Sequence, residues 1–276
     1  FSMDALAQFP VEKTLKFFQE LGICTTDRSG WIYPRSNQAQ SVVDVLVMKA
    51  RSLKVKLKTN QTVTGVSFAD GQWKIHTDGW TYSGDAVILA NGSRASSVAG
   101  SCESGYEIAK SLGHHLIEPL PALTALKCKG NSFSGWSGVR TEGKITLYID
   151  GTPTVSQQGE LQLTDYGVSG IPVFQISRYA IRAVHENKNV ELSINFFPEL
   201  NRKELEEYLK RRKAACPYKT EKELLIGLFP EKLIRVLCAQ KDLIRGITDF
   251  RLPVKNGLSF EQAQVCSGGV DTSEVH

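Results

Sequence analysis

The stretch DAVILANGSRASSVAGSCESGYEIAKSLG, residues 85–113, decides the fold class of this chain. A short apolar run, DAVILA, comes first, a loop rich in glycine and serine follows, and a helix is predicted from about Glu103. Because the apolar run is continuous, we expect a strand covered on both faces, as in a parallel sheet. Backbone N–H groups at the mouth of the following helix can hold a nucleotide phosphate or the edge of a flavin. The stretch therefore predicts an α/β unit and marks a candidate nucleotide site.

Small residues at the end of the predicted strand let a flat cofactor approach the backbone. They are Ala90, Asn91, Gly92 and Ser93. Further along, Gly100 and Gly105 keep the loop open, and Ser101 is a candidate helix cap. A strand–turn–helix joint without any ligand explains the same residues, so this stretch alone leaves both interpretations open.

Upstream of this stretch the pattern predicts two helices and an antiparallel meander. One helix covers 11–21 and stops at Gly22, and a second is capped by Ser36 or Asn37 and ends near Leu53. Its predicted buried face uses Val42, Val43, Leu46 and Leu53. Alternating strands follow at 55–59 and 62–68, and the Asp-Gly pairs at 70–71 and 78–79 predict hairpin turns.

Downstream of residue 118 the pattern changes to short strand-like runs, which predict a β-rich second domain. LTALKCKG, GVRTEGKITLYID, GELQLTD and VELSINFF are the main runs. SGIPVFQISRYAIRAV is predicted to be a helix with Pro172 at its first position. The segment from 198 to 246 is predicted to be helical, with Asn201 as a cap, and the chain is extended again from Ile247.

Two more glycine-rich segments are candidate sites. TDYGVSGIP, residues 164–172, precedes a helix N-terminus that could hold an anion or a substrate carbonyl. CSGGV, residues 266–270, has two adjacent glycines that suggest a close backbone approach. Without a ligand, residues 164–172 would be an ordinary crossover loop, and Cys266 would be a small buried thiol. The local sequence does not decide between these structural roles and the binding roles.

Composition and charge exclude several classes of protein. The chain has 276 residues, 41% hydrophobic residues and a net charge of +4, which is typical of a globular protein. The basic run 210–213 follows glutamates on one helix and is interpreted as a solvated helix end, so we expect no nucleic-acid partner. No run is long enough to span a membrane, and no signal peptide is recognised. Six dispersed cysteines without metal-ligand spacing indicate free thiols and a cytoplasmic location.

Taken together, the motifs resemble the BaiN/YhiN-type family of FAD-dependent oxidoreductases, also known as aminoacetone oxidase-like flavoproteins. The matching pieces occur in family order: FFQELGI, GWIYPRSNQAQSVVDVL, the residues 86–114, LPALTALKC, GELQLTDYGVSG and FEQAQVCSGGV. The chain departs from the family at Asn91-Gly92 and at Cys266-Ser267, where other members often carry Thr-Gly or Gly-Gly and Thr-Ala. The six ordered matches cover nearly the whole chain.

The resemblance implies an α/β plus β architecture, in which a two-dinucleotide-binding FAD domain carries an inserted β-barrel-like domain and a small helical subdomain. Residues 1–118 and 263–276 would belong to the FAD domain, and 119–262 would be the insert, with its helical part at 199–246. It also implies cofactor contacts from Val63, Ala90, Asn91, Gly92, Ser93, Gly105, Gly268 and Gly269. Tyr166 and Ser169 would face the substrate.

The implied function is hydride or electron-pair transfer between NAD(P)H, FAD and a small organic molecule. No catalytic acid or base and no metal ligand can be assigned. Since the chain contains no GxGxxG after a strand, we expect this polypeptide alone to bind FAD weakly and to be inactive. The family's segment that closes over the flavin is also expected to lie outside it. A non-catalytic module that binds a ligand or a partner is the alternative.

Overall fold

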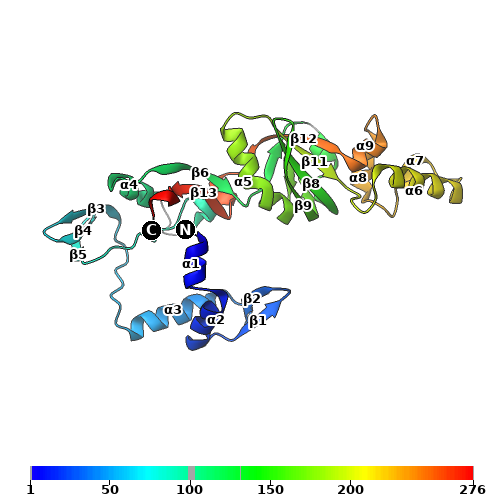
Figure 1. Cartoon of the computed structure of the whole chain (residues 1–276). Coiled ribbons are helices and arrows are strands. Elements are labelled where there is room, and N and C mark those ends of the chain that lie inside the picture. Colours follow the sequence, from blue (N-terminus) through cyan, green and yellow to red (C-terminus); the bar gives the residue numbers. More distant parts are fainter. Residues whose placement is uncertain (1, 99–102, 131, 276) are drawn as a thin grey trace. The chain divides into compact units, whose positions relative to one another are not determined.

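The computed structural model describes residues 2–98, 103–130 and 132–275. The chain divides into two compact units, one of residues 1–88 with 271–276 and one of residues 89–270 (Figure 1). This division follows packing within each unit. The domain boundaries predicted after residues 118 and 262 differ from it, and they stay a prediction.

The first unit contains helices, a two-stranded ribbon and a separate three-stranded sheet. Its elements are α1 (Ser2–Gln8), α2 (Val11–Glu20), β1 (Thr25–Arg28), β2 (Trp31–Pro34), α3 (Gln40–Ser52), β3 (Val63–Ala69), β4 (Gln72–Thr77), β5 (Thr81–Gly84) and the short 3₁₀ helix at Thr272–Glu274. Strands β1 and β2 pair antiparallel, and so do β3, β4 and β5 in that order. The predicted meander is therefore confirmed.

Two local predictions for the first unit hold. Helix α2 ends where expected, because Gly22 adopts a φ of +90° that favours glycine, and its N–H donates to the carbonyl of Gln19. Between β3 and β4, Asp70 and Gly71 both have positive φ, as the tight turn of a hairpin requires.

The cap and the buried face predicted for α3 are wrong. The helix begins at Gln40 after Ala39, and the Ser36 hydroxyl instead hydrogen-bonds the Ser41 hydroxyl at 3.1 Å. Three of the four side chains of the predicted buried face are exposed: Val43, Leu46 and Leu53. Within its unit this helix therefore keeps an apolar face without a packing partner among the described residues.

Two predicted strands do not form. Residues 55–59 and 85–90 have no strand conformation, and Ile88 is 90% exposed. A strand is stabilised by its hydrogen-bonded neighbours, and no described residue pairs with either segment. The prediction of a doubly covered parallel strand at 85–90 is therefore wrong for this structure.

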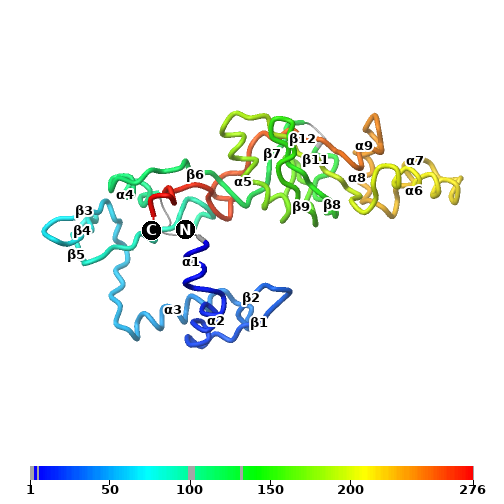
Figure 2. The backbone as a smooth tube through the Cα atoms, in the orientation of Figure 1, coloured from blue at the N-terminus to red at the C-terminus, as the bar shows by residue number. Residues whose placement is uncertain are grey.

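The second unit is built around a closed six-stranded antiparallel barrel. Its strands are β7 (Leu126–Cys128), β8 (Val139–Ile149), β9 (Thr152–Leu163), β10 (Gly167–Ser169), β11 (Val190–Asn195) and β12 (Phe250–Gly257). Their order around the barrel is β10-β7-β12-β11-β8-β9, and the tube in Figure 2 shows this group as one bundle. Closure leaves no open sheet edge, and the β-rich second region is confirmed.

Alternation of side chains fills the barrel. On β8, Ile145 and Leu147 are fully buried, while the intervening and flanking side chains are more exposed, and β9 repeats the pattern with Leu161 and Leu163. Trp136 is part of this core and packs against three phenylalanine rings. Its Nε1–H donates to the carbonyl of Thr164 at 3.1 Å. The core is thus a filled interior of apolar side chains.

Helix α5 (Ile171–His185) packs on the barrel and on β6 (Leu116–Ala122). Pro172 is its second residue, one position later than predicted, because the helix begins at Ile171. Strand β6 pairs antiparallel with β13 (Val265–Val270), and α4 (Ser104–Ser111) precedes β6 in the chain. Short 3₁₀ helices lie at Ala95–Ser97, Ser132–Gly135 and Phe260–Gln262.

The helical region predicted between 198 and 246 is confirmed. It consists of α6 (Arg202–Ala215), α7 (Glu221–Leu224), α8 (Glu231–Cys238) and α9 (Leu243–Thr248). Asn201 caps α6 through a reciprocal capping box with Glu204, as its sequence position suggests. The basic run is more than a solvated end, because Arg212 donates to the carbonyls of Leu224 and Ile226 and so ties α6 to the segment around α7.

Candidate functional site

The loop before α4 forms the first of two glycine corners, which we define as Asn91 with Gly105. A Cβ added at Gly105 would lie 2.0 Å from Asn91 Oδ1, so the amide of Asn91 rests directly on this glycine. Gly105 is buried within the first turn of α4. The loop therefore contacts the first turn of α4, although the strand predicted before the loop is absent.

The second glycine corner is Gly268 with Gly269 on β13. Their φ values are +104° and +111°, and the register of β13 against β6 shifts at this point. A Cβ at Gly268 would lie 2.6 Å from the carbonyl oxygen of Glu118, so the strand pairing itself requires glycine here. Gly268 is exposed and Gly269 is buried.

Tyr106 joins the two corners. It follows Gly105 in α4, and a Cβ at Gly269 would lie 3.6 Å from its ring. The thiol of Cys266 on β13 lies next to its hydroxyl. Burial raises the pKa of the Tyr106 hydroxyl, and the neighbouring Cys266 and Glu103 raise it further.

Other contacts fasten the same two segments together. The hydroxyl of Ser96 donates to the carbonyl of Ala263 at 2.8 Å. The guanidinium of Arg94 lies 4.3 Å from the centre of the Phe260 ring and pairs with Glu103 at 2.7 Å. These contacts bring the loop at residues 94–96 together with residues 260–263, more than 160 positions further along the chain.

A cavity of about 590 Å³ opens beside Tyr106. It lies along α4 and the start of β6, and its lining includes Glu103, Glu107, Lys110 and Glu118. Its size is in the range of small-molecule sites. No motif identified Tyr106 or this cavity in the sequence, because the pairing of Tyr106 with Cys266 exists only in the folded chain.

The remaining predicted cofactor residues divide between the two units. Gly92 is exposed with a φ of +78°, and the Ser93 hydroxyl accepts a hydrogen bond from the Ala95 N–H at 3.3 Å. Ala90 is exposed in the same loop. Val63, on β3, belongs to the first unit. Gly100 and Ser101 lie outside the described residues.

The loop predicted to face the substrate is part of the barrel wall. Gly167 begins β10, and a Cβ there would lie 2.3 Å from the carbonyl oxygen of Leu126. Ser169 is buried, and Tyr166 is half-buried with its carbonyl accepting from the Cys128 N–H at 2.9 Å. No contact given for the described residues links Tyr166 or Ser169 to the two glycine corners.

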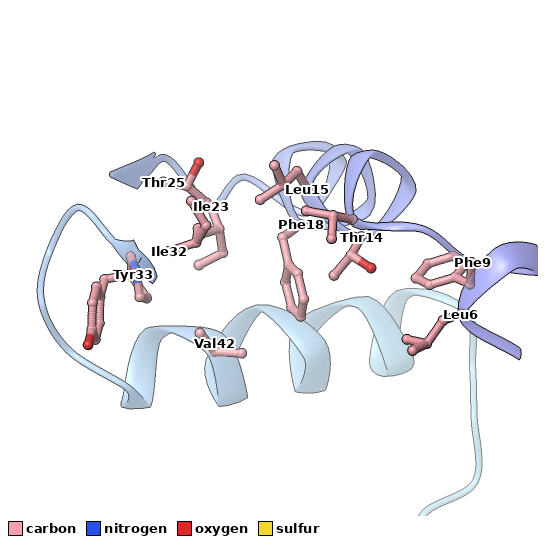
Figure 3. Close-up of a pocket in the computed structure, with 12 residues that line it drawn as sticks. Leu6, Phe9, Thr14, Leu15, Phe18, Ile23, Thr25, Ile32, Tyr33 and Val42 are labelled. Carbon is pink, nitrogen blue, oxygen red and sulfur yellow. The ribbon is translucent and has the colours of Figure 1, made fainter. Parts of the chain in front are cut away.

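A further apolar cavity, of about 360 Å³, lies within the first unit. Figure 3 shows Phe18 of α2 pointing toward α3, Val42 on the facing side of α3, and Ile32 and Tyr33 contributed by β2. Sequence analysis did not identify this cavity. The only sequence signal for it is the apolar spacing on α2.

Three exclusions hold within the described ranges. No group of three or more His, Cys, Asp or Glu side chains there could hold a metal ion. None of the helices seen there combines the length and apolar character needed to cross a bilayer. The five cysteines that are described are free thiols, as predicted.

Comparison with known proteins gives matches over the whole chain. A 3-dehydro-bile acid delta(4,6)-reductase of Clostridium scindens is 39% identical over 293 residues, which covers 100% of this chain and 72% of that protein. Ribosomal RNA dihydrouridine synthases of Escherichia coli and Haemophilus influenzae are 25% and 24% identical, with 70% and 71% of their lengths covered.

Residues 1–276 also match the family described as HI0933-like protein Rossmann domain. This match and the 39% identical reductase confirm the resemblance to BaiN/YhiN-type flavoproteins that the six ordered motifs indicate. The chain therefore belongs to the HI0933-like family of Rossmann-domain proteins.

Proposed function

We propose that the chain is the central part of an FAD-dependent oxidoreductase that takes electrons from NAD(P)H. In this proposal residues 1–118 and 263–276 belong to a two-dinucleotide-binding FAD domain, and residues 119–262 are an insert. The placement of the barrel and the helices α6 to α9 within 119–262 supports that division.

The observation that carries the proposal is the meeting of the two glycine corners through Tyr106. Gly92 and Gly268 both present exposed backbone with positive φ near this meeting point, so no side chain of their own blocks the approach of a flat ring. These residues fit a flavin edge. When bound, the flavin would supply the capacity to accept and deliver a hydride.

The residues of this chain would position that cofactor. Asn91 is held against Gly105, and its amide lies beside the exposed Gly92 backbone. The Tyr106 hydroxyl, whose pKa is raised by burial and by the neighbouring Cys266 and Glu103, lies next to Cys266 on β13. This pair would fix the distance between α4 and β13 while the cofactor binds.

The relatives' names support a class of substrate. A delta(4,6)-reductase and a dihydrouridine synthase each add hydrogen across a carbon–carbon double bond. We propose the same reaction for this protein, on a small organic molecule whose double bond is conjugated to a carbonyl group. The 39% identity to the bile acid reductase, against 25% and 24% for the synthases, favours a small molecule over RNA.

RNA is the second candidate substrate, and one feature of the chain favours it. Between residues 199 and 246 there are twelve Lys and Arg against eight Asp and Glu, a net charge of +4 that equals the net charge of the whole chain. Such a local excess could meet a phosphate backbone.

The test is to express the protein from its complete reading frame and titrate it with FAD. We expect a bound yellow chromophore that NAD(P)H bleaches, and a turnover of a 3-dehydro bile acid that exceeds that of ribosomal RNA. Gly92→Ala should weaken FAD binding, whereas Gly71→Ala, at a hairpin turn with nearly the same φ of +77°, should not. A protein that binds no FAD would favour the non-catalytic binding module.

A further inference from the structure

A cationic groove runs along α5 beside β13, in the second unit. It encloses about 460 Å³, and three basic side chains line it, Arg178, Arg182 and Lys188. Ser267, the residue before the second glycine corner, lines it as well. Figure 1 shows α5 next to β6 and β13, in agreement with the contacts between α5 and β6. The groove therefore adjoins the proposed flavin site.

The charge of the groove is unbalanced. Its one acidic side chain, Glu186, pairs with Lys188 at 2.6 Å. In the part of the chain that the structure describes, neither Arg178 nor Arg182 forms an ion pair. Glu186 also interacts electrostatically with Arg182, so three cations share one carboxylate, and the groove keeps a positive charge that attracts anions.

Arg182 is held in place for a ligand. Its Nη2 donates to the carbonyl of Glu118 on β6 at 2.9 Å and to the carbonyl of Ser267 on β13 at 3.4 Å. A guanidinium has five N–H donors, and these two contacts leave others available. The Arg182 guanidinium is therefore fixed at the carbonyl of Ser267, the residue before Gly268, before any ligand arrives, and this lowers the entropy cost of binding.

The groove also offers an aromatic surface. The Tyr179 ring is 38% exposed, and the guanidinium of Arg178 lies 4.5 Å from its centre. Arginine forks match the geometry of phosphate oxygens, and an aromatic ring can stack on a base. A ligand with a single carboxylate would pair with only one arginine of the groove. A diphosphate joined to a base would pair with two of the cations and would also contact the Tyr179 ring.

We propose that this groove binds the adenosine diphosphate part of the nicotinamide dinucleotide that reduces the flavin. The proposal rests on the proposed function, because the groove gains this role from its place beside the flavin corner. Arg178 and Lys188 bind the phosphate oxygens, Arg182 holds the inner phosphate next to Ser267, and Tyr179 lies against the base.

The first experiment measures direct binding of ADP and of inorganic pyrophosphate to the chain by calorimetry. The double variant Arg178→Gln/Lys188→Gln removes two exposed charges, and Lys144→Gln, which removes one exposed charge on β8, is the control for a loss of charge outside the groove. Since the double variant removes two charge-assisted contacts to phosphate oxygens, it should bind ADP at least about tenfold more weakly. The control should bind it unchanged.

The second experiment uses the complete protein loaded with FAD. The double variant should raise the KM for NAD(P)H about tenfold with kcat preserved, by the same loss of contacts. ADP binding that is undetectable in the wild type, or equal in the variant and the control, overturns the proposal. So does a groove that binds a short single-stranded RNA but not ADP. A different result would contradict the proposed function: the flavin of the wild-type protein would not be bleached by NAD(P)H, whether or not the groove binds ADP.

Discussion

Replacing Gly105 with Ala tests the first glycine corner. Where the backbone conformation suits alanine, this change stabilises a protein by about 0.4–1 kcal/mol through the unfolded chain, and Gly105 sits in a helix without a positive φ. The added Cβ would lie 2.0 Å from Asn91 Oδ1, so the amide must rotate away. Rotation loses its 3.4 Å hydrogen bond to the Gly92 carbonyl and costs about 1–2 kcal/mol in rotamer strain and lost bonding.

In the wild type the stabilisation through the unfolded chain and the cost of rotating the Asn91 amide oppose each other, and a double-mutant cycle separates the two. We expect Gly105→Ala to change the free energy of unfolding by about −1.5 to 0 kcal/mol in the wild type, and to raise it by about 0.4–1 kcal/mol in an Asn91→Ala background. Urea titrations of the four proteins give the coupling, which should be about 1–2 kcal/mol. Equal effects of Gly105→Ala in both backgrounds would refute the contact and with it this corner of the site.

Three further changes probe the rest of the second unit. Gly268→Ala combines a φ of +104° with a 2.6 Å approach to the Glu118 carbonyl, so urea denaturation should show a loss of at least about 2 kcal/mol. Trp136→Ala removes a fully buried ring and should cost about 3–5 kcal/mol in the same assay; a loss below 1 kcal/mol would contradict the packing described. Burial raises the pKa of the Cys128 thiol to about 12 from its ordinary 9.0, so the unfolded chain loses this proton first. The unfolding free energy, relative to Cys128→Ala, should therefore fall as pH rises from 9.0 to about 12, and a flat difference would count against this burial.

Local sequence patterns predict the β-rich second region and the positions of most helices, because each of these patterns has its own physical cause. The alternation that buries Ile145 and Leu147 on β8 follows from the two-residue period of a strand. The capping box of Asn201 and Glu204 satisfies helix N–H groups with side chains three residues apart. Such patterns depend only on residues close together in the sequence, so they can be recognised without knowing the tertiary structure.

The predictions that were wrong and the site residues that were missed have a different cause: each depends on contacts with residues far along the chain. The apolar run at 85–90 has the composition of a buried strand, yet composition cannot state whether a neighbouring strand is present. Neither Tyr106 nor Cys266 carries a local signal for the other, because they are 160 residues apart. Arg182 likewise gains its role only from carbonyls on two other strands.

The main hydrophobic core, which stabilises the fold, lies apart from the glycine corners of the candidate site. The large buried cluster runs from Leu126 to Val254, so the barrel and its helices form one core. The glycine corners lie outside that cluster and are fastened mainly by polar and ring contacts, such as Ser96 to Ala263 and Arg94 to Phe260. Regions with few buried apolar contacts open at lower free energy than the core. A ligand that bridges both corners would supply the missing contacts, and by mass action it would stabilise this region more than the barrel. In the protein expressed from its complete reading frame, hydrogen exchange that slows at α4 and β13 on adding FAD, while β8 and β9 stay unchanged, is the behaviour that this arrangement requires.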